Sequence, residues 1–270
     1  MGVLEKQKIV SIEKMDTDRF IETIIYKKIA DYLNIKTADI DYNKHDRSEY
    51  NVTFKQSIPN NAEVVGIEDL LYHFLKSYRS DDTKEITDKQ FEKQVKDLRS
   101  TIKSLSGIES YIRRSYPKKI SYNSSRSILR DITKVVTLDY LLGNNSNEAT
   151  DFKLYSTVPN EYKLLETIPS ANLFQTSASM TLTTNINSKF EFLSSIKKFD
   201  RAMGLNNTLT YFLDYMISYY DKIDPVTFYE LVNDAFDEYE IMFNKSYMDK
   251  LEKNYYKQRT LIKNNMRLYK

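Results

Sequence analysis

The sequence contains no Cys and no Trp, only two His, and five each of Gly and Pro. Without Cys, a disulfide framework, a thiolate metal site and a Cys nucleophile are excluded. His45 and His73 are too few for a zinc site of His ligands or a His-based triad. Glycine is scarce, and neither G-x-G-x-x-G nor G-K-[ST] occurs, so we expect no glycine loop that cradles a phosphate.

The overall composition is that of a folded chain. The chain has 270 residues, of which 41% are hydrophobic and 29% charged, close to the averages of globular domains. The net charge of +2 is a weak electrostatic case for nucleic-acid binding by the whole protein. There is no signal-like apolar run at the N-terminus and none of the ~18 residues that a membrane span needs. We therefore expect a cytoplasmic location and no membrane partner.

The first 62 residues predict a small α+β lobe. Lys8–Lys14 alternates apolar and polar residues as a strand does, and Phe20–Leu33 repeats apolar residues at helical spacing. Ala38–Tyr42 and Tyr50–Ile58 are two further strand candidates, and polar residues join them. The order strand, helix, strand, strand is typical of an α+β unit.

Residues 63–270 predict a larger helical lobe, so the fold class is α+β and predominantly helical. A Ser-rich turn or cap is expected at Ser121–Ser127, and a short hairpin is expected near 152–168, with strands at Phe152–Tyr155 and Tyr162–Ile168. Pro225 at the first position of a helix begins an aromatic stripe that we interpret as core. The expected helices before it are Ile67–Tyr78, Phe91–Leu105, Ile128–Leu142, Phe190–Arg201 and Leu209–Asp221.

The last 21 residues are basic. Lys250–Lys270 holds seven Lys or Arg and one acidic residue, with three Tyr interleaved, which leaves the rest of the chain slightly acidic. Such a run is usually a solvated helix face. The alternative is contact with an anionic partner, either nucleic acid or an acidic protein face. The candidate contacts are Lys250, Lys253, Lys257, Arg259, Lys263 and Arg267.

Six segments follow a known family in order and spacing. They are Glu22–Ile35, Asp39–Tyr42, Tyr50–Phe54, a pattern at Glu63, Glu68, Leu70 and Leu71, then Thr137–Phe152 (TLDYLLGNNSNEATDF) and Ile168–Asn172 (IPSAN). The segment Thr137–Phe152 is similar to the family pattern F-D-x-L-I-x-N-T-D-R-H-x-x-N-F. Over roughly residues 8–180 the chain resembles the HipA-like and CtkA-like bacterial Ser/Thr kinases. The resemblance implies a kinase-like small lobe, truncated at its start, followed by a large helical lobe.

The resemblance also implies where a catalytic site would lie, and several positions depart from it. Ser146 stands at the position of the Asp that orients the hydroxyl nucleophile, and Asn147 and Glu148 replace the Arg and His that follow. Asp151 and Asn172 occupy the two metal positions, with Asp and Asn exchanged between them. A neutral Ser is a poor general base, and a neutral Asn is a poor magnesium ligand beside carboxylate.

The phosphate-holding end of the implied site is equally incomplete. Glu22 matches the helix Glu of the family, and Lys14 or Lys8 is the candidate for the strand Lys that this Glu would fix. No glycine loop accompanies them. If catalysis is retained, ATP and Mg would be the cofactors, and otherwise none is expected.

These departures favour a pseudokinase-type regulator or interaction module, from bacteria or phage, that binds a protein partner. One alternative is an active HipA-like Ser/Thr protein kinase with an altered metal site, in which Glu148 and Asp151 supply carboxylates. A second is a nucleic-acid-binding module that uses the basic C-terminal helix. A toxin–antitoxin or phage–host role would suit the resemblance. GNNSNE also remains open to a plainer interpretation, as an Asn/Ser-rich loop between a helix and a hairpin.

Overall fold

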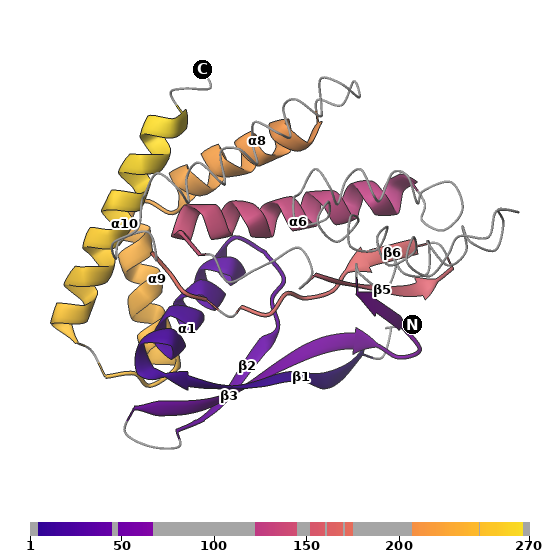
Figure 1. The fold of residues 1–270 in the computed structure, drawn as a ribbon, viewed down its shortest axis with the longest axis horizontal. Coiled ribbons are helices and arrows are strands. Elements are labelled where there is room, and N and C mark those ends of the chain that lie inside the picture. Colours follow the sequence, from indigo (N-terminus) through magenta and orange to yellow (C-terminus); the bar gives the residue numbers. More distant parts are fainter. Residues whose placement is uncertain are drawn as a thin grey trace, which may run out of the picture.

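The computed structural model describes most of the two ends of the chain and part of its middle. Five helices and two three-stranded sheets lie in the described residues (Figure 1). No helix among these residues is long and apolar enough to cross a bilayer. The described ranges are 5–44, 48–66, 122–144, 152–159, 161–169, 171–174, 207–242 and 244–266.

The first sheet has the order β1-β3-β2 and is antiparallel throughout, with β1 at Glu5–Asp16, β2 at Asp39–Lys44 and β3 at Glu49–Pro59. Helix α1, Thr17–Tyr32, follows β1 directly and covers one face of this sheet (Figure 1). Side chains alternate between the faces of a strand, so the buried residues of β3 recur at every second position.

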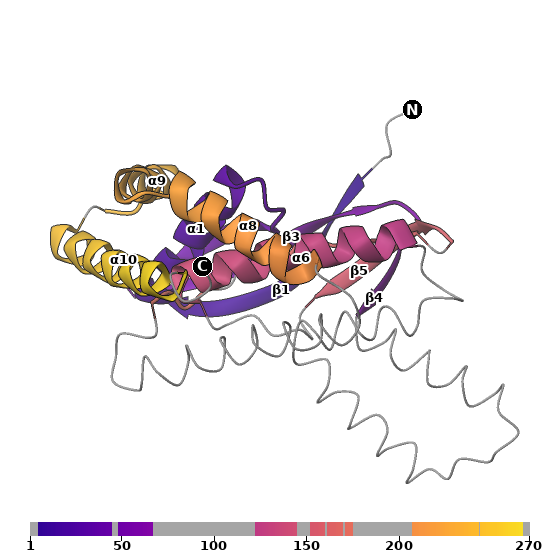
Figure 2. The same cartoon turned by 90° about the horizontal axis from the view of Figure 1, so that it is seen from above.

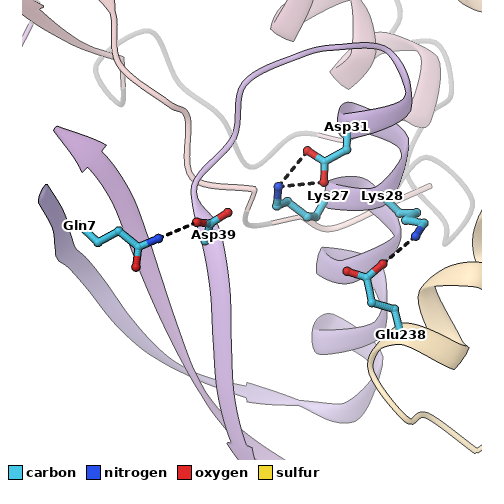
Figure 3. Close-up of polar contacts among 6 residues, drawn as sticks. All are labelled: Gln7, Lys27, Lys28, Asp31, Asp39 and Glu238. Carbon is cyan, nitrogen blue, oxygen red and sulfur yellow. Dashed lines mark hydrogen bonds and ion pairs between the residues drawn. The ribbon is translucent and has the colours of Figure 1, made fainter. Parts of the chain in front are cut away.

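Helix α1 forms where the sequence predicts it because its start and its buried face are both specified. The carboxylate of Asp16 accepts the backbone N–H of Arg19 at 2.8 Å and so caps the helix. Ile24, Ile25 and Ile29 are fully buried, which contributes about 1.5–3 kcal/mol for each side chain. The exposed side of α1 carries an ion pair between Lys27 and Asp31 (Figure 3).

The second sheet has the order β4-β5-β6, with β4 at Glu63–Gly66, β5 at Lys153–Val158 and β6 at Glu161–Leu164. Helix α6, Tyr122–Leu142, packs against β6. The short strand β4 therefore ties the segment after the first sheet to the hairpin that follows α6, and the two parts of the fold meet there.

Three helices complete the described structure: α8 at Asn207–Lys222, α9 at Pro225–Glu238 and α10 at Lys245–Met266. Helix α8 runs along α6, while α9 packs against α1 (Figures 1 and 2). Lys28 of α1 and Glu238 of α9 form an ion pair at 2.6 Å across this contact (Figure 3). Helix α10 contacts both α6 and α9.

Most predicted elements in the described residues are present, with shifted ends. Ser121–Ser127 was predicted as a turn or cap, and the turn is wrong because α6 already begins at Tyr122. Ser and Asn side chains compete for backbone partners, which is why the sequence pattern favours a turn or cap there. The second hairpin strand ends at Leu164 rather than Ile168, and strand β4 was not predicted.

Other predictions concern the C-terminal part or fall outside the description. Pro225 does begin a helix, capped by Asp224, and five predicted stripe residues of α9 are buried. The basic C-terminal helix begins at Lys245, earlier than expected. The helices predicted at Ile67–Tyr78, Phe91–Leu105 and Phe190–Arg201 lie outside the described residues.

Candidate functional site

The C-terminus of α6 is built to hold the start of the GNNSNE loop in one position. Gly143 has φ of +62°, a left-handed conformation that favours glycine. Its N–H donates to the carbonyl of Tyr140, and the N–H of Asn144 donates to the carbonyl of Asp139 at 2.8 Å. These two bonds form a Schellman motif, which satisfies helix carbonyls that would otherwise lack partners.

Asn144 extends this cap into a link with a distant segment. Its side-chain Nδ2 donates to the carboxylate of Asp139 at 2.8 Å, and its Oδ1 accepts the backbone N–H of Asn172 at 3.1 Å. Asn144 and Asp139 are both buried. The side-chain amide of Asn144 therefore links the end of α6 to the IPSAN segment by hydrogen bonds.

All four residues of Ala171–Phe174 donate their backbone N–H to a partner. Ala171 donates to Thr23 Oγ1 at 3.3 Å, and Leu173 donates to Glu22 Oε2 at 2.8 Å, so two bonds come from α1. Asn172 donates to Asn144, and Phe174 to the carbonyl of Leu142 at 3.1 Å, so the other two bonds come from α6. The segment is thus clamped between the two helices.

Phe174 closes this clamp. It has φ of +55°, and its ring packs edge-on against Phe228 and Tyr255, with centroids 6.2 Å from each. A Cβ on Gly143 would lie 3.4 Å from the Cα of Phe174. The left-handed backbone of Phe174 is held by the packing of its ring, because such a conformation costs about 1 kcal/mol or more for a non-glycine residue.

Glu22 lies partly buried at the α1 side of the clamp. Burial raises the pKa of Glu22 to about 7, against the lowering effects of the Leu173 N–H and of Lys250 on α10. The nearby carboxylates of Asp18 and Asp16 raise this pKa further. Burial raises the pKa of the Tyr247 phenol on α10, and the nearby carboxylate of Glu22 raises it further. Glu22 is therefore surrounded by α1, the clamped segment and α10.

The structure does not bring Lys14 and Glu22 together. In the β1–β3 register Met15 pairs with Tyr50, and both side chains are buried on the face that α1 covers. Lys14 pairs with Asn51 and is exposed, so it lies on the opposite face of the sheet. The interpretation of Lys14 as the strand lysine beside Glu22 is not supported by this register.

Lys8 is exposed and lies on the same face of the sheet as Met15, at the far end of β1. A bulge between Ile9 and Ser11 shifts the alternation, and Lys8 pairs with the buried Gln56. Its neighbour Gln7 bonds Asp39 across the outer face, as Figure 3 shows. Lys8 is seven residues from Met15, roughly 20 Å of extended strand at ~3.3 Å per residue. Along β1 it is therefore remote from the end that adjoins α1.

The strand residue that meets α1 at the level of the clamp is Met15. Its Sδ lies 3.7 Å from the hydroxyl of Thr23, which in turn accepts the N–H of Ala171. Met15 is 2% exposed. A buried thioether thus contacts α1 next to Glu22, where the kinase resemblance implies a lysine ammonium.

Several predicted site residues lie outside the described part of the chain. Asn172 is described, and its backbone is part of the clamp. The residues outside are Ser146, Asn147, Glu148, Asp151 and Arg267, together with His45 and His73.

The basic residues of α10 divide into two groups. Arg259 is turned into the protein: its Nη1 donates to the carbonyls of Tyr220 and Ile223 at 2.5 Å, and its guanidinium lies 3.7 Å from the Tyr220 ring centroid. It caps the C-terminus of α8, where a cation is favourable, so its interpretation as an anionic-partner contact does not fit. The exposed lysines of this helix are Lys245, Lys250, Lys253, Lys257 and Lys263.

Sequence reasoning missed the residues that build the clamp. Asp139 and Asn144 coincide with the Asp and Asn of the family pattern, so the pattern marked their positions but not their structural role. No sequence pattern marks Thr23, and the family resemblance points to its neighbour Glu22 instead. Glu22 itself was singled out, and the structure gives it a backbone partner.

The comparisons agree with this architecture. No family model matches the sequence, and no curated protein matches it. Among solved structures, the HipA of Shewanella oneidensis MR-1, determined with HipB and operator DNA, superposes with a TM-score of 0.53 and 12% identity. The match covers 90% of this chain and 55% of the HipA chain, so this chain spans about half of that protein. The proinflammatory kinase CtkA of Helicobacter pylori gives a TM-score of 0.55 and 12% identity, covering 98% of this chain and 95% of CtkA.

Proposed function

We propose that this chain, whose fold is that of the HipA- and CtkA-like kinases, is a catalytically degenerate member of that fold that works as a regulatory or interaction module. A shared fold does not carry a shared activity, so the proposal is argued from the site. Its main support is the surroundings of Glu22. The carboxylate bonds the N–H of Leu173, and the strand residue beside this part of α1 is Met15 rather than a lysine.

The fold implies ATP and magnesium as cofactors, and the described residues do not fit them. Phosphoryl transfer depends on fixed positive charge at the phosphates and on carboxylates that hold the metal. Lys14 lies on the outer face, and Lys8 lies roughly 20 Å along β1 from Met15 at ~3.3 Å per residue. Asn172, at one implied metal position, offers a neutral amide.

The bonds that hold Ala171–Phe174 also support an interaction function. In this structure Ala171–Phe174 is held by bonds to Thr23, Glu22, Asn144 and Leu142, all within the protein. The arrangement of α1 against α6 consequently needs no nucleotide to complete it. A segment fixed in this way supplies a constant surface for a partner, which is what an interaction module requires.

Thermal denaturation with ATP and magnesium tests the proposal. We expect a change in melting temperature below about 1 °C, because a ligand stabilises a fold only in proportion to its binding. Incubation with radiolabelled ATP should give no labelled protein. A clear stabilisation that Asn172→Ala or Asp151→Ala abolishes would instead favour the alternative of an active Ser/Thr kinase with an altered metal site.

Nucleic-acid binding is the second candidate, and the exposed lysines of α10 are the observation that favours it. It predicts binding that weakens steeply with salt and disappears when residues 245–270 lose their positive charges. Because Arg259 is bonded to α8, it should contribute little to the salt dependence.

A further inference from the structure

Helix α9 lies in a stretch of sequence that carries charge of one sign. No Lys or Arg occurs between Lys222 and Lys245, whereas six acidic residues do. Three of them, Glu230, Asp234 and Asp237, are exposed on α9 and recur at helical spacing. Residues three and four apart are neighbours on a helix surface, so these three carboxylates form one acidic row along the exposed side of α9.

Helix α10 presents the opposite charge on its own exposed side. Lys250, Lys253 and Lys257 are exposed and also recur at helical spacing, so they form a lysine row. The Lys250 ammonium lies 5.8 Å from the Tyr247 ring centroid. Among the described residues, no member of either row is in an ion pair. Both rows are therefore available to a partner.

The two rows match when the helices are laid side by side in opposite directions. Along α9 the acidic residues are separated by four and then three positions, and the lysines have the same separations when α10 is followed from its C-terminal end. At ~1.5 Å per residue, each row therefore places its charges about 6 Å and 4.5 Å apart. The aligned pairs are Glu230 with Lys257, Asp234 with Lys253, and Asp237 with Lys250.

The same alignment also brings apolar residues together. One turn beyond the first ion pair, Val226 is level with Leu261. Val226 is 66% exposed, and Leu261 is partly exposed. The exposed Asp249 of α10 is level with Glu238, but that carboxylate is bonded to Lys28 of α1. The like-charged pair therefore lies to the side of the two rows, and the alignment is favourable along its length.

Within one chain, α9 and α10 are placed for a two-fold arrangement. Both helices lie at the same end of the molecule (Figures 1 and 2), and Figure 1 shows them running in opposite directions. A two-fold axis that ran along the helices and between them would set α9 of each copy against α10 of the other, antiparallel. This is the direction that the charge alignment requires, and a two-fold interface must be complementary to itself in this way.

We propose that this chain self-associates as a two-fold dimer through α9 and α10, with the acidic row of each copy against the lysine row of the other. Each exposed ion pair is weak, so the dimer depends on three pairs formed twice, together with the Val226–Leu261 contacts. We expect a dissociation constant on the order of 10–100 µM at low salt. The inference goes beyond the proposed function and does not depend on it.

Sedimentation velocity of the full chain, over a range of about 5–500 µM, tests the dimer. The wild type should dimerise with rising concentration at about 50 mM salt and much less at about 500 mM, because salt screens exposed charges. Two triple variants reverse the rows: one carries Glu230→Lys, Asp234→Lys and Asp237→Lys, and the other carries Lys250→Glu, Lys253→Glu and Lys257→Glu. Each should raise the dissociation constant by about tenfold or more.

The matched control changes the net charge as the lysine-row variant does, but on the two sheets. It carries Lys6→Glu, Lys153→Glu and Lys163→Glu, all at exposed positions. Its dissociation constant should stay within about twofold of the wild type. An increase as large as that of the lysine-row variant would show an effect of net charge and overturn the inference.

A mixture of the two row variants is the sharpest test. One variant has lysines in both rows and the other has carboxylates in both, so each repels itself and complements the other at both contacts. The equimolar mixture should therefore restore the dimer. The inference is overturned if the wild type is monomeric throughout, or if both variants dissociate and their mixture does not associate. A monomeric wild type whose lysine row binds a labelled single-stranded oligonucleotide would assign that row to nucleic acid instead.

The two proposals fail separately. Stabilisation by ATP with an intact dimer would remove the degenerate-kinase proposal and leave the dimer. A monomeric wild type with no effect of ATP would remove the dimer and leave the proposed function.

Discussion

The carboxylate of Glu22 accepts the backbone N–H of Leu173 at 2.8 Å, across 151 residues of sequence. The bond joins α1 to the segment that follows the second sheet. Met15 is buried on the same side of the first sheet and lies against Thr23. Glu22 therefore bonds a backbone N–H, whereas the kinase resemblance implies that it pairs with a lysine.

This placement gives stability a dependence on pH. Burial raises the pKa of Glu22 to about 7, above its ordinary 4.5. Between these values the folded chain binds a proton that the unfolded chain has released, so stability falls as pH rises through this window. We expect the wild type to lose on the order of 1–2 kcal/mol more than Glu22→Gln between pH 5 and pH 7.5, after allowing for solvent screening.

Urea unfolding at pH 5 and pH 7.5 measures this difference. Only the comparison of the two proteins isolates Glu22, because burial also raises the pKa of Glu166 and so adds a dependence of the same sign. Equal losses in the wild type and in Glu22→Gln would show that Glu22 does not titrate in this window.

Asn144 should matter far more than Asn172 to stability. The Asn144 side chain is 1% exposed and bonds both Asp139 and the N–H of Asn172. Asn144→Ala removes the hydrogen bonds to the buried Asp139 carboxylate and to the N–H of Asn172, and should cost about 2–4 kcal/mol. Asn172→Ala keeps the backbone N–H that takes part in the clamp, and should cost less than about 1 kcal/mol.

The midpoints of urea unfolding for these two variants provide the check. Their order distinguishes a structural clamp from a metal site, because Asn172 is one of the implied metal positions. A larger loss for Asn172→Ala than for Asn144→Ala would contradict the role given to Asn144.

Gly143 allows a second test of the α6 terminus. Its φ of +62° and the nearby Cα of Phe174 both oppose a side chain. Gly143→Ala should lower the free energy of unfolding by about 1–2 kcal/mol, because alanine is strained in the left-handed region. Gly143→Asn should lose less, since Asn tolerates that conformation better than Ala. Thermal melts of the three proteins give the order, and a more stable alanine variant would argue against the strain.

The sequence predicted the elements better than the site for a definite physical reason. Helix α1 carries its own cap at Asp16 and its own apolar periodicity, and both are local signals. Strand β4, Glu63–Gly66, has only four residues and is defined by its pairing with β5. That pairing spans about ninety residues of sequence and leaves no local pattern.

The choice between Lys8 and Lys14 shows a second limit. Simple alternation along β1 places every even-numbered residue on one face. The bulge between Ile9 and Ser11 breaks this rule, so Lys8 and Lys14 lie on opposite faces of the sheet. A bulge depends on the partner strand, so the sequence of β1 alone does not predict it. The resemblance drew attention to Glu22, but it did not reveal the backbone bond that Glu22 makes.

Arg259 and Lys263 lie one turn apart on α10 and should respond to mutation in opposite ways. Arg259 bonds two carbonyls at the end of α8 and stacks on Tyr220. Arg259→Gln removes a cation from a helix C-terminus together with its hydrogen bonds, and should cost about 1–3 kcal/mol. Lys263→Gln changes an exposed side chain and should stay within about 0.5 kcal/mol of the wild type.

Melting temperature and heparin retention, measured on the same two variants, separate stability from anion binding. Arg259→Gln should melt several degrees lower yet elute from heparin at nearly the wild-type salt concentration, because its guanidinium is turned into the protein. Lys263→Gln should melt like the wild type and elute slightly earlier. If Arg259→Gln elutes much earlier and melts like the wild type, then Arg259 contacts anions. Its bonds to α8 would then make no contribution to stability.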